Sequence, residues 1–454
     1  MIFDQIRTIH FVGIGGIGMS GIAEILNGAG LLVTGCDLKR SAATDLLASR
    51  GIVVTIGHDP SHVHGNDLIV ITSAVRGEHA EVDAARAQGI PVMKRAEVLG
   101  ALVNEKRSVA VAGTHGKTTT SAMIAMVLEA AGLDPTILVG GMVRNLGTNA
   151  KRGAGDLLVV EADEYDRTFH QLHPQIAVVT NIEADHLEYY KTFENILEAF
   201  RIFVGGIKRN GVVIGCADDE HVAHLLRHAE PRRVGYGLSE HADLRAVNLE
   251  FNELGSSFEV PGVGFFKLFI PGEHNVCNAL AAIAVGRELG ISGEVIASGL
   301  AKFLGVDRRF QILGSYHGAI VVDDYAHHPT EIRATLEAAR GGYPDRRIVA
   351  LFQPHLYSRT QDFARDFGEA LLVADVPIVA PIYAAREKPV DGLSARIISD
   401  AVEGVEFLDR SHAEIVNELR QRLRPNDILI TMGAGDVHEI AEELVEEEPA
   451  REDA

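Results

Sequence analysis

The sequence predicts an α/β protein of three domains, and three observations lead to that prediction. The chain has 454 residues, which exceeds what one hydrophobic core usually holds. Short apolar runs alternate with stretches of helical apolar spacing, the order expected of parallel sheets covered by helices. Hydrophobic residues make up 46% of the chain and glycine is plentiful at 46 residues, a composition typical of a compact α/β protein.

The first hundred residues read as repeated strand–helix units and predict a Rossmann-like domain over residues 1–103. A short apolar strand in RTIHFVG runs into GIGGIGMSGIAEILNGAG, where small residues give way to helical apolar spacing. Further strands are expected in LLVTGCD and DLIVITS. The polar NEKR at residues 104–107 then marks a boundary.

Two further series of strands predict the central and C-terminal domains. The second series predicts a P-loop-type ATP-binding domain with a mostly parallel sheet over residues 104–306, with strands in SVAVAG, DLLVVEAD, IAVVTNI and GVVIGCAD. Alternating patterns at residues 243–270 add a few antiparallel strands to it. The third series predicts a Rossmann-like domain over residues 307–454, with strands in AIVVDDY, RRIVALF, VPIVAPI and DILITMG.

Charge and cysteine content narrow the function classes. The formal net charge of −21 argues against nucleic-acid binding, which needs a basic surface. Cys36, Cys216 and Cys277 include no CxxC pair, so their spacing indicates neither a disulfide framework nor a thiolate zinc site. No signal-peptide pattern and no long apolar run occurs, so we expect no membrane insertion and a cytoplasmic location.

The stretch VAVAGTHGKTTTSAMIAM, residues 109–126, reads as a buried strand, a glycine turn with one lysine, and a helix. A strict Walker A loop would need its first glycine where Val111 stands, so the strict pattern fails. The demanding part of a phosphate loop remains: Gly113, Gly116, Lys117, Thr118 and Thr119. Glycines let backbone N–H groups approach phosphate oxygens, and the helix N-terminus and the lysine supply positive charge. The stretch predicts a nucleotide phosphate site, with a plain glycine turn as the alternative.

Candidate metal ligands follow the neighbouring strands. Glu161 ends the strand of VVEADEYD, and His186 lies a few residues beyond the strand of VVTNIEADHLEYY. Oxygen ligands suit Mg²⁺, and an imidazole can complete a site that also uses substrate phosphate. Each residue alone would also fit an ordinary surface role. Their shared position beside the phosphate loop, where the Thr118 hydroxyl can also reach a magnesium ion, favours a metal site.

The first glycine cluster has two readings. Gly13, Gly15 and Gly18 spell GxGxxG after a strand, and Asp37 ends the next strand near the spacing of a ribose-binding acid. This is also the pattern of nicotinamide-dependent oxidoreductases. Because a phosphate loop follows a hundred residues later, we favour a nucleotide diphosphate that need not be a redox cofactor. Ser73, at the end of LIVITSA, fits a sugar or phosphate contact and a helix cap equally well.

A polar cluster opens the third domain. It comprises Arg308, Arg309, Asp323, Asp324, Tyr325, His327 and His328. Its composition alone would fit a metal site. An ATP-dependent enzyme instead needs an arginine to neutralise charge during phosphoryl transfer and polar groups to hold the nucleoside, so we favour a nucleotide site.

Eight motifs together, in order and over nearly the whole chain, resemble the Mur ligase family. They are GIGGIGMSGIAE, GTHGKTTT, EADEYD, NIEADHLEYY, GEHNVCNALAA, GVDRRFQ, DDYAHHPTEI and FQPHLYSR. The first motif and DDYAHHP are most similar to the members that add L-alanine to UDP-N-acetylmuramate, in the synthesis of the peptidoglycan precursor. Members that recycle murein tripeptide usually carry a cysteine in the first motif, which this chain lacks.

The resemblance implies a reaction and its partners. ATP phosphorylates the lactyl carboxylate of UDP-N-acetylmuramate, and the amine of L-alanine attacks the acyl phosphate to give the amide, ADP and phosphate. Such phosphoryl transfer depends on positioning and charge neutralisation more than on covalent work by the protein. The expected partners are therefore UDP-N-acetylmuramate, L-alanine and ATP with Mg²⁺. The protein itself is expected to be a monomer or a homodimer.

The resemblance also assigns roles to residues of this chain. ATP would be bound by Gly113, Thr114, His115, Gly116, Lys117, Thr118, Thr119, Asn275, Asn278, Arg309 and Asp324. Mg²⁺ would be held by Thr118, Glu161 and His186. The UDP-sugar would contact Gly15, Gly16, Ile17 and Gly18, and Asp37 and Ser73 are added as further contacts from their positions at strand ends. The catalytic set would be Lys117, His186, Arg309, His327 and His355, with the last two near the reacting carboxylate or the incoming alanine.

Two positions depart from the family pattern, and one of them is Leu356, which stands in FQPHLYSR where the family usually has an arginine. Several members carry a modified lysine after the metal-ligand histidine, which helps to order a second magnesium ion, and the comparable residue here is Arg201. A carbamylated lysine is therefore not expected. Besides the ligase, two functions stay open at the level of sequence: a nicotinamide-dependent oxidoreductase, and a nucleotide-gated binding protein without ligation chemistry.

Overall fold

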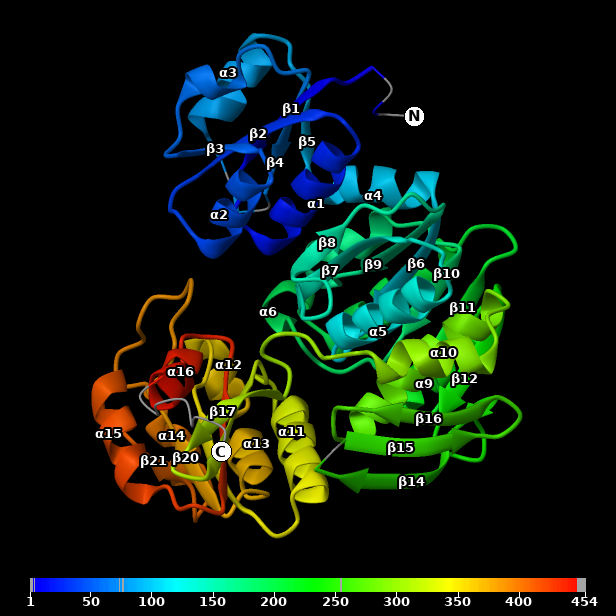
Figure 1. Ribbon diagram of the computed structural model, residues 1–454. Helices are drawn as coiled ribbons and strands as arrows, with labels where there is room; N and C mark the ends of the chain where they lie inside the picture. The colour runs from blue at the N-terminus through cyan, green and yellow to red at the C-terminus, as the bar shows by residue number, and fades with distance from the viewer. Residues whose placement is uncertain (1–2, 4, 73, 76, 254, 447–454) are drawn as a thin grey trace, which may run out of the picture. The chain divides into compact units, whose positions relative to one another are not determined.

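The computed structural model describes residues 3, 5–72, 74–75, 77–253 and 255–446 (Figure 1). The chain divides into two compact units. The first unit comprises residues 1–247, 259–266 and 277–303, and the second comprises 248–258, 267–276 and 304–454. Among the described residues, no helix combines the length and apolar character needed to cross a lipid bilayer.

The first unit begins with a five-stranded parallel sheet in the order β3-β2-β1-β4-β5. Its strands are β1 (Thr8–Val12), β2 (Leu32–Asp37), β3 (Val53–Ile56), β4 (Leu68–Ile71) and β5 (Val92–Lys94). The connecting helices are α1 (Ile17–Gly28), α2 (Ala42–Ser49), the 3-10 helix η1 (Pro60–Val63), α3 (Ala80–Ala87) and α4 (Arg95–Glu105). This is the strand order of a Rossmann-like domain, as predicted.

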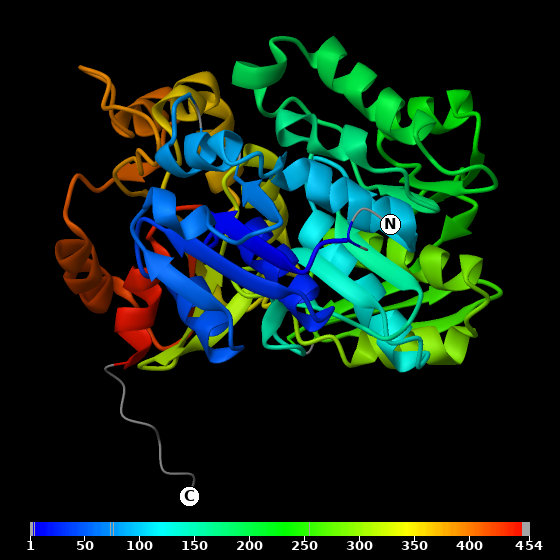
Figure 2. The ribbon, with the colours of Figure 1, turned by 90° about the horizontal axis from the view of Figure 1, so that it is seen from above.

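Helices cover both faces of this sheet: α1 and α2 lie on one side and α3 on the other (Figures 1 and 2). Because side chains alternate along a strand, β1 contributes to two cores. Ile9 and Phe11 join a large apolar cluster with α1. Val12 joins a smaller one that includes Cys36 and Val82 of α3. The sheet therefore carries buried side chains on both faces.

An eight-stranded sheet follows in the first unit, in the order β13-β12-β11-β10-β6-β9-β7-β8. Every pairing is parallel except that of β8 with β7. Its strands are β6 (Arg107–Ala112), β7 (Thr136–Val143), β8 (Thr148–Lys151), β9 (Leu157–Glu161), β10 (Ile176–Val179), β11 (Val212–Cys216), β12 (Arg232–Gly237) and β13 (Leu244–Arg245). The four strands predicted here are confirmed as β6, β9, β10 and β11, and the β7–β8 hairpin is an addition.

The helices of this region are α5 (Lys117–Ala130), η2 (Tyr165–Gln171), α6 (Leu187–Tyr190), α7 (Phe193–Gly205), α8 (Glu220–His228), α9 (Glu273–Glu288) and α10 (Gly293–Ala301). Residues 117–128 of α5 include eleven buried side chains, which makes it a core helix and not a surface one. The strands β14 (Val247–Asn252), β15 (Gly255–Val260) and β16 (Gly264–Leu268) form a three-stranded sheet of their own.

The second unit holds a six-stranded sheet in the order β17-β18-β22-β19-β20-β21. Its strands are β17 (Gln311–Tyr316), β18 (Ala319–Asp324), β19 (Arg347–Phe352), β20 (Val376–Val379), β21 (Glu406–Phe407) and β22 (Asp427–Met432). Only the β17–β18 pairing is antiparallel. Its helices are α11 (Pro329–Gly342), α12 (Tyr357–Asp362), α13 (Ala364–Leu371), α14 (Arg396–Ala401), α15 (His412–Arg422) and α16 (His438–Glu446). The α/β prediction of mostly parallel sheets is confirmed.

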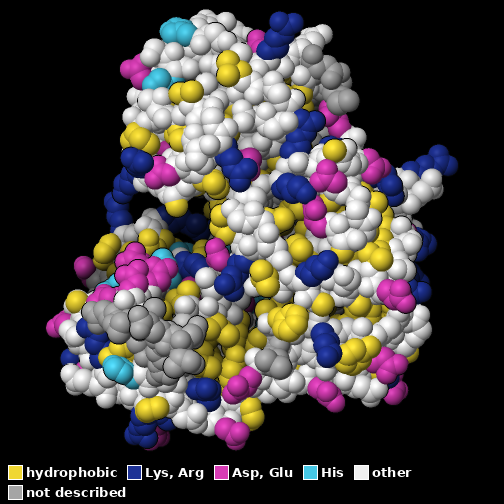
Figure 3. All heavy atoms as spheres, viewed as in Figure 1, with side chains coloured by type: hydrophobic (Ala, Val, Ile, Leu, Met, Phe, Trp, Pro, Cys, Tyr) yellow, Lys and Arg dark blue, Asp and Glu magenta, His cyan; other side chains and the backbone are white. Residues whose placement is uncertain are grey.

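Surface charge is mixed on the face shown in Figure 3. Basic and acidic side chains are interspersed there across the described residues. The acidic excess of the sequence, a formal net charge of −21, is thus accompanied by local positive side chains that can serve small anionic ligands.

Candidate active site

The predicted phosphate loop lies between β6 and α5, as the sequence indicates. Gly113 and Gly116 have φ values of +141° and +79°, a region that favours glycine. A Cβ atom at Gly113 would lie 1.9 Å from Thr180 Oγ1, and one at Gly116 would lie 2.6 Å from Asn278 Oδ1. Both glycines are therefore required by the backbone conformation and by close neighbours.

The end of β10 fixes the shape of this loop. The backbone N–H of His115 donates to Asn181 Oδ1 at 2.8 Å, and Thr180 Oγ1 donates to His115 O at 2.6 Å. The N–H of Glu183 donates to Thr114 Oγ1 at 2.8 Å. Since neighbouring parallel strands end at one edge, β10 supplies these contacts from the position where a sheet usually binds ligands.

Lys117 is folded against its own loop. Its Nζ donates to Gly113 O at 2.6 Å and to Glu164 Oε2 at 2.9 Å. Burial alone would lower the pKa of Lys117, but the carboxylates of Glu164, Asp163 and Glu161 raise it above its ordinary value. The lysine is thus a buried, permanent cation at the phosphate loop.

The predicted metal ligands come together beside the lysine. Thr118 Oγ1 donates to Glu161 Oε2 at 2.8 Å, and the Gly140 N–H donates to the same oxygen at 2.7 Å. His186 Nε2 lies 3.9 Å from Glu164 Oε1, the carboxylate that holds Lys117. His186 has a φ of +54°, a left-handed conformation that few non-glycine residues adopt. Such strain is typical of functional sites.

Asn278 also lies at the phosphate loop, as predicted. Thr120 Oγ1 donates to Asn278 Oδ1 at 3.0 Å, and Asn278 is buried. Asn275 belongs to the second unit, where its Nδ2 donates to Pro271 O at 2.7 Å.

In the second unit, Arg309 and His327 lie at the carboxylate of Glu331, and the ring of His355 lies beside that of His327. Arg309 Nη1 lies 3.6 Å from Glu331 Oε1, and the backbone N–H of His327 donates to Glu331 Oε2 at 3.0 Å. The His327 ring centroid is 6.1 Å from that of His355. The guanidinium of Arg309 also lies over the Tyr325 ring, 5.4 Å from its centroid. These groups form a compact polar cluster at the start of α11.

Asp324 lies at the end of β18 and is buried. Its carboxylate accepts hydrogen bonds of 2.7 Å from the backbone N–H groups of Phe310 and Ala326. Burial raises the pKa of Asp324 to about 6, against the opposing effects of Arg309 and these two donors. The neighbouring Asp323 pairs with Arg308 at 3.0 Å and accepts from Thr431, so both aspartates brace the turn that carries Arg309.

The first glycine cluster forms a tight turn before α1. The Gly15 N–H donates to Asp37 Oδ2 at 2.8 Å, and Gly16 is the N-cap of α1 without a side-chain cap. Ile17 is exposed to 47%. A Cβ at Gly18 would lie 2.9 Å from Arg95 Nη1, so a guanidinium lies over the beginning of α1. The Arg95 guanidinium and the backbone N–H groups at the start of α1 together form a positive surface that suits a diphosphate. Ser73 lies outside the described residues.

The sequence pattern did not indicate three residues that the structure places at the candidate sites: Glu164, Glu331 and Arg95. Glu164 is one of four acidic residues in EADEYD, and only its burial against Lys117 distinguishes it. Glu331 follows Pro329 in the first turn of α11, where an acidic residue usually serves the helix dipole. Arg95 begins α4, about eighty residues after the glycine turn that it covers.

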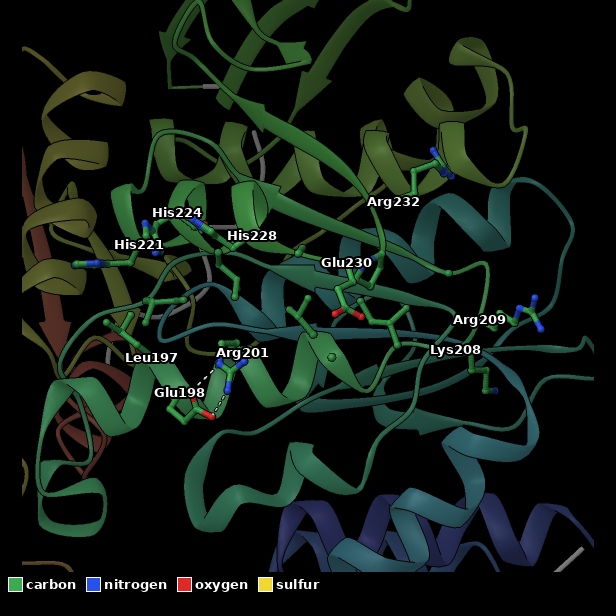
Figure 4. A pocket seen from close by; sticks show the side chains of 18 of the residues that line it. Leu197, Glu198, Arg201, Lys208, Arg209, His221, His224, His228, Glu230 and Arg232 are labelled. Atoms are coloured by element: carbon green, nitrogen blue, oxygen red, sulfur yellow. Dashed lines mark hydrogen bonds and ion pairs between the residues drawn. The ribbon is translucent and has the colours of Figure 1, made fainter.

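Arg201 pairs with a neighbour on its own helix. It is an exposed residue of α7 whose Nε lies 2.7 Å from Glu198 Oε2 (Figure 4). Both residues line a pocket of about 1200 Å³ between α7 and α8, together with Lys208, His221 and His228. Among the described residues that line it, none belongs to the phosphate loop. Arg201 therefore takes no part in the geometry of the predicted metal ligands.

Family models match three stretches of the chain. The model described as "Mur ligase family, catalytic domain" matches residues 8–107. "Mur ligase middle domain" matches residues 111–286, and "Mur ligase, glutamate ligase domain" matches residues 308–435. The three matches follow one another without overlap, in the order of the three main sheets.

Individual proteins are similar over the full length. A UDP-N-acetylmuramate–L-alanine ligase of Desulfatibacillum aliphaticivorans is 46% identical, over 96% of this chain and 98% of the relative. The crystal structure of a UDP-N-acetylmuramate-alanine ligase from Thermotoga maritima is 30% identical with a TM-score of 0.81, over 97% of this chain and 98% of that one. A murein peptide ligase from Psychrobacter arcticus, 25% identical over the same shares, has a TM-score of 0.71.

These matches and the geometry of the phosphate loop agree with the resemblance seen in the motifs. The chain belongs to the Mur ligase family.

Proposed function

We propose that this chain joins L-alanine to UDP-N-acetylmuramate at the expense of ATP. The observation that carries the proposal is the 46% identity, over nearly both full lengths, to a relative named for this reaction. A terminal phosphoryl group of ATP passes to an oxygen of the lactyl carboxylate, and ADP leaves. The neutral amine of L-alanine then attacks the acyl carbon, loses a proton and expels inorganic phosphate, which leaves the amide.

The phosphate loop would bind ATP through backbone donors and one cation. Residues 113–119 supply amides at the start of α5, and the buried ammonium of Lys117 would contact the terminal phosphates. Lys117 has to exchange the carboxylate of Glu164 for phosphate oxygens when ATP binds. Thr114, His115 and Thr119 complete the loop, and Asn278 braces it.

The donor set at the end of β9 fits Mg²⁺. The Thr118 hydroxyl and the Glu161 carboxylate are hard oxygen ligands 2.8 Å apart, the kind that Mg²⁺ prefers, and His186 would complete the set. When bound, Mg²⁺ would neutralise phosphate charge during the transfer. Thr118, Glu161 and His186 would hold it beside Lys117.

The second unit would supply the remaining charged and polar groups. Arg309, held over Tyr325 and near Glu331, would neutralise phosphate charge, and Asp324 and Asn275 would hold the nucleoside. His327 and His355 would position the reacting carboxylate or the alanine amine. Gly15, Gly16, Ile17, Gly18, Asp37 and Ser73, with Arg95 added, would hold the UDP-sugar.

The proposal also covers the domain bounds, the oligomeric state and the cellular location of the protein. The three domains would extend over residues 1–103, 104–306 and 307–454. The protein would act in the cytoplasm, where its nucleotide substrates are found, as a monomer or homodimer.

An amino-acid panel tests the proposal. With ATP, Mg²⁺ and UDP-N-acetylmuramate, ADP should be released rapidly with L-alanine and far more slowly with other amino acids or with none. Efficient use of murein tripeptide in place of L-alanine would assign the chain to the recycling reaction instead. ATP hydrolysis at a rate independent of UDP-N-acetylmuramate and L-alanine would indicate a nucleotide-gated binding protein. A substrate-dependent absorbance change with NAD(P)H would indicate an oxidoreductase.

A further inference from the structure

Four potential metal ligands converge in the N-terminal sheet, in a place unrelated to the phosphate loop. They are His10 of β1, Cys36 of β2, His62 of η1 and Glu81 of α3. Each offers one ligand atom, and these four atoms all lie within 4.8 Å of one another. Successive members of the cluster are at least 19 positions apart in the sequence, so no short motif reveals the cluster.

Glu81 is the centre of the cluster. Its side chain is fully buried, and Cys36 Sγ donates to Oε1 at 3.1 Å. His62 Nδ1 lies 2.7 Å from the same oxygen. His58 Nδ1 lies 3.0 Å from the other oxygen, Oε2, and 3.2 Å from Cys36 Sγ. Within the described chain, every ion-pair partner of Glu81 is a histidine, so no lysine or arginine offsets this buried carboxylate.

His10 provides the observation that points to a ligand. Its side chain is only 3% exposed, and its Nδ1 is engaged with Thr34 Oγ1 at 2.8 Å. Nε2 is buried, and the described residues provide no hydrogen-bond partner for it. Because Nδ1 is already engaged by Thr34, Nε2 is the His10 nitrogen that remains for a metal ion. A buried polar nitrogen without a partner is costly, and a metal ion would satisfy it.

The protonation states suit a metal. Burial lowers the pKa of His10 to about 4, so its imidazole is neutral and its Nε2 lone pair is available. Burial works to raise the pKa of Glu81, but hydrogen bonds from Cys36 and His62 hold it below its ordinary value. Burial and the Glu81 contact raise the pKa of the Cys36 thiol, which therefore keeps its proton until a cation replaces it.

We propose that His10, Cys36, His62 and Glu81 form a structural zinc site. Nitrogen, thiolate sulfur and carboxylate oxygen are the ligand types of tetrahedral Zn²⁺, whose bond lengths place ligand atoms roughly 3.3–3.8 Å apart. To reach the lower end of that range, the contacts of 2.7 and 3.1 Å to Glu81 need to lengthen by roughly 0.6 and 0.2 Å. One Zn²⁺ enters as the Cys36 thiol releases one proton to water, and with one thiolate and one carboxylate the site is neutral.

The surroundings support this assignment. Thr34 fixes the ring of His10 through Nδ1, and His58 holds the outer oxygen of Glu81, as outer partners of zinc ligands usually do. The side chain of His62 is 18% exposed and gives the ion an entry path from solvent. The backbone oxygen of Cys36 accepts from the N–H of Gly13 at 2.9 Å, so zinc would brace the strand ends that carry the first glycine turn.

Cobalt spectroscopy of the intact chain tests the site. The purified protein is stripped with a chelator, returned to excess Mg²⁺ and titrated with Co²⁺ and then Zn²⁺. Wild type should bind one Co²⁺ with thiolate-to-cobalt charge-transfer absorption, which one equivalent of Zn²⁺ abolishes. Zinc should also raise the melting temperature. Cys36→Ser should lose the absorption, and Cys216→Ser, at another buried cysteine, should retain it.

A milder variant covers the case in which Cys36→Ser does not fold. Thr34→Val removes only the outer partner of His10 and should weaken zinc binding about 10–100-fold, as outer-shell losses do. Absence of thiolate absorption in the wild type would overturn the proposal. So would absorption that persists in Cys36→Ser or disappears in Cys216→Ser, and so would zinc affinity unchanged by Thr34→Val.

Discussion

Lys117 and Glu164 form a buried ion pair at the phosphate loop, with Nζ 2.9 Å from Oε2. The lysine side chain is 14% exposed and the glutamate side chain 5%. Lys117 also donates to the loop carbonyl of Gly113 at 2.6 Å, so its position is set before any phosphate arrives. The pair places a shielded cation where the terminal phosphates of ATP are expected, and a carboxylate that the phosphates must displace.

Replacing Lys117 should separate stability from catalysis. Lys117→Ala should abolish turnover but leave binding of UDP-N-acetylmuramate intact, because the sugar nucleotide is assigned to the N-terminal domain. The same change leaves Glu164 buried without its cation, which should cost about 3–5 kcal/mol of folding free energy. Adding Glu164→Gln should recover most of that stability without restoring turnover. Thermal melts and ADP release check both effects, and ligation by the single variant would contradict the phosphate assignment.

Thr118 offers a test of the magnesium ligands. Thr118→Val keeps the shape of the side chain but removes the hydroxyl that lies 2.8 Å from Glu161. The Mg²⁺ concentration for half-maximal rate should rise at least about tenfold. Loss of a residue that only positions a metal ligand already lowers metal affinity about 10–100-fold, and Thr118 is a proposed ligand itself. Thr118→Ser keeps the hydroxyl and should behave nearly like wild type. Equal magnesium dependence in the two variants would remove Thr118 from the site.

The loop glycines should tolerate no side chain. Gly113→Ala places a Cβ 1.9 Å from Thr180 Oγ1 at a φ of +141°, so the loop must distort and ATP-dependent turnover should be lost. Gly132→Ala is the matched control, since it also has a positive φ, +68°, but no atom within 4 Å of the new Cβ. It should cost only about 1–2 kcal/mol of stability and keep activity. Similar rates in both variants would argue against a rigid loop.

Arg95 should distinguish the two nucleotide sites. Arg95→Ala removes the guanidinium that lies over Gly18, and a lost charge-assisted hydrogen bond costs about 1.5–3 kcal/mol. The KM for UDP-N-acetylmuramate should therefore rise at least about tenfold, and the KM for ATP should stay unchanged. Arg86→Ala, at an exposed arginine of α3, serves as the control. A rise in the KM for ATP alone would reverse the assignment of the first glycine cluster.

Asp324 should make stability depend on pH. Its pKa of about 6 in the folded chain exceeds the ordinary value of 3.8, because the carboxyl is buried. The folded chain then holds a proton that the unfolded chain releases, so this stabilisation is complete below about pH 4 and is lost as pH rises through 6. The upper limit is roughly 3 kcal/mol.

Melting temperatures between pH 4 and 7, without nucleotide, check this effect. Asp324→Asn removes the titration, so wild type should lose stability relative to the variant as pH rises. Asp345→Asn, at an exposed aspartate of the same unit, should follow wild type. A difference between wild type and Asp324→Asn that stays constant over this range would show that Asp324 does not titrate there.

The sequence predicted the local chemistry of the site well. Strand, turn and helix around Gly113–Thr118 are neighbours in the chain, so their spacing alone specifies the phosphate loop. Glu161 could be placed because parallel strands end at one edge of a sheet. The β7–β8 hairpin and the antiparallel strand β17 were not expected, because their stability comes from pairing across the sheet more than from their own pattern.

Partners from distant elements could not be predicted. Glu164 and Glu331 look like any surface carboxylate until burial and an opposing cation single them out. His10, Cys36 and Glu81 lie on three different elements, so no pair of closely spaced cysteines marks the cluster in the sequence. The strand register, which sets His10 and Cys36 on one face of the sheet, is what joins them.

Oxygen transfer tests whether the ATP-dependent ligation passes through an acyl phosphate. UDP-N-acetylmuramate labelled with ¹⁸O in both oxygens of the lactyl carboxylate is converted with ATP and L-alanine, and the released phosphate is analysed by mass spectrometry. Each released phosphate should carry one ¹⁸O atom and the amide carbonyl the other, with ADP as the nucleotide product. Unlabelled phosphate formed alongside the amide would contradict the acyl-phosphate route.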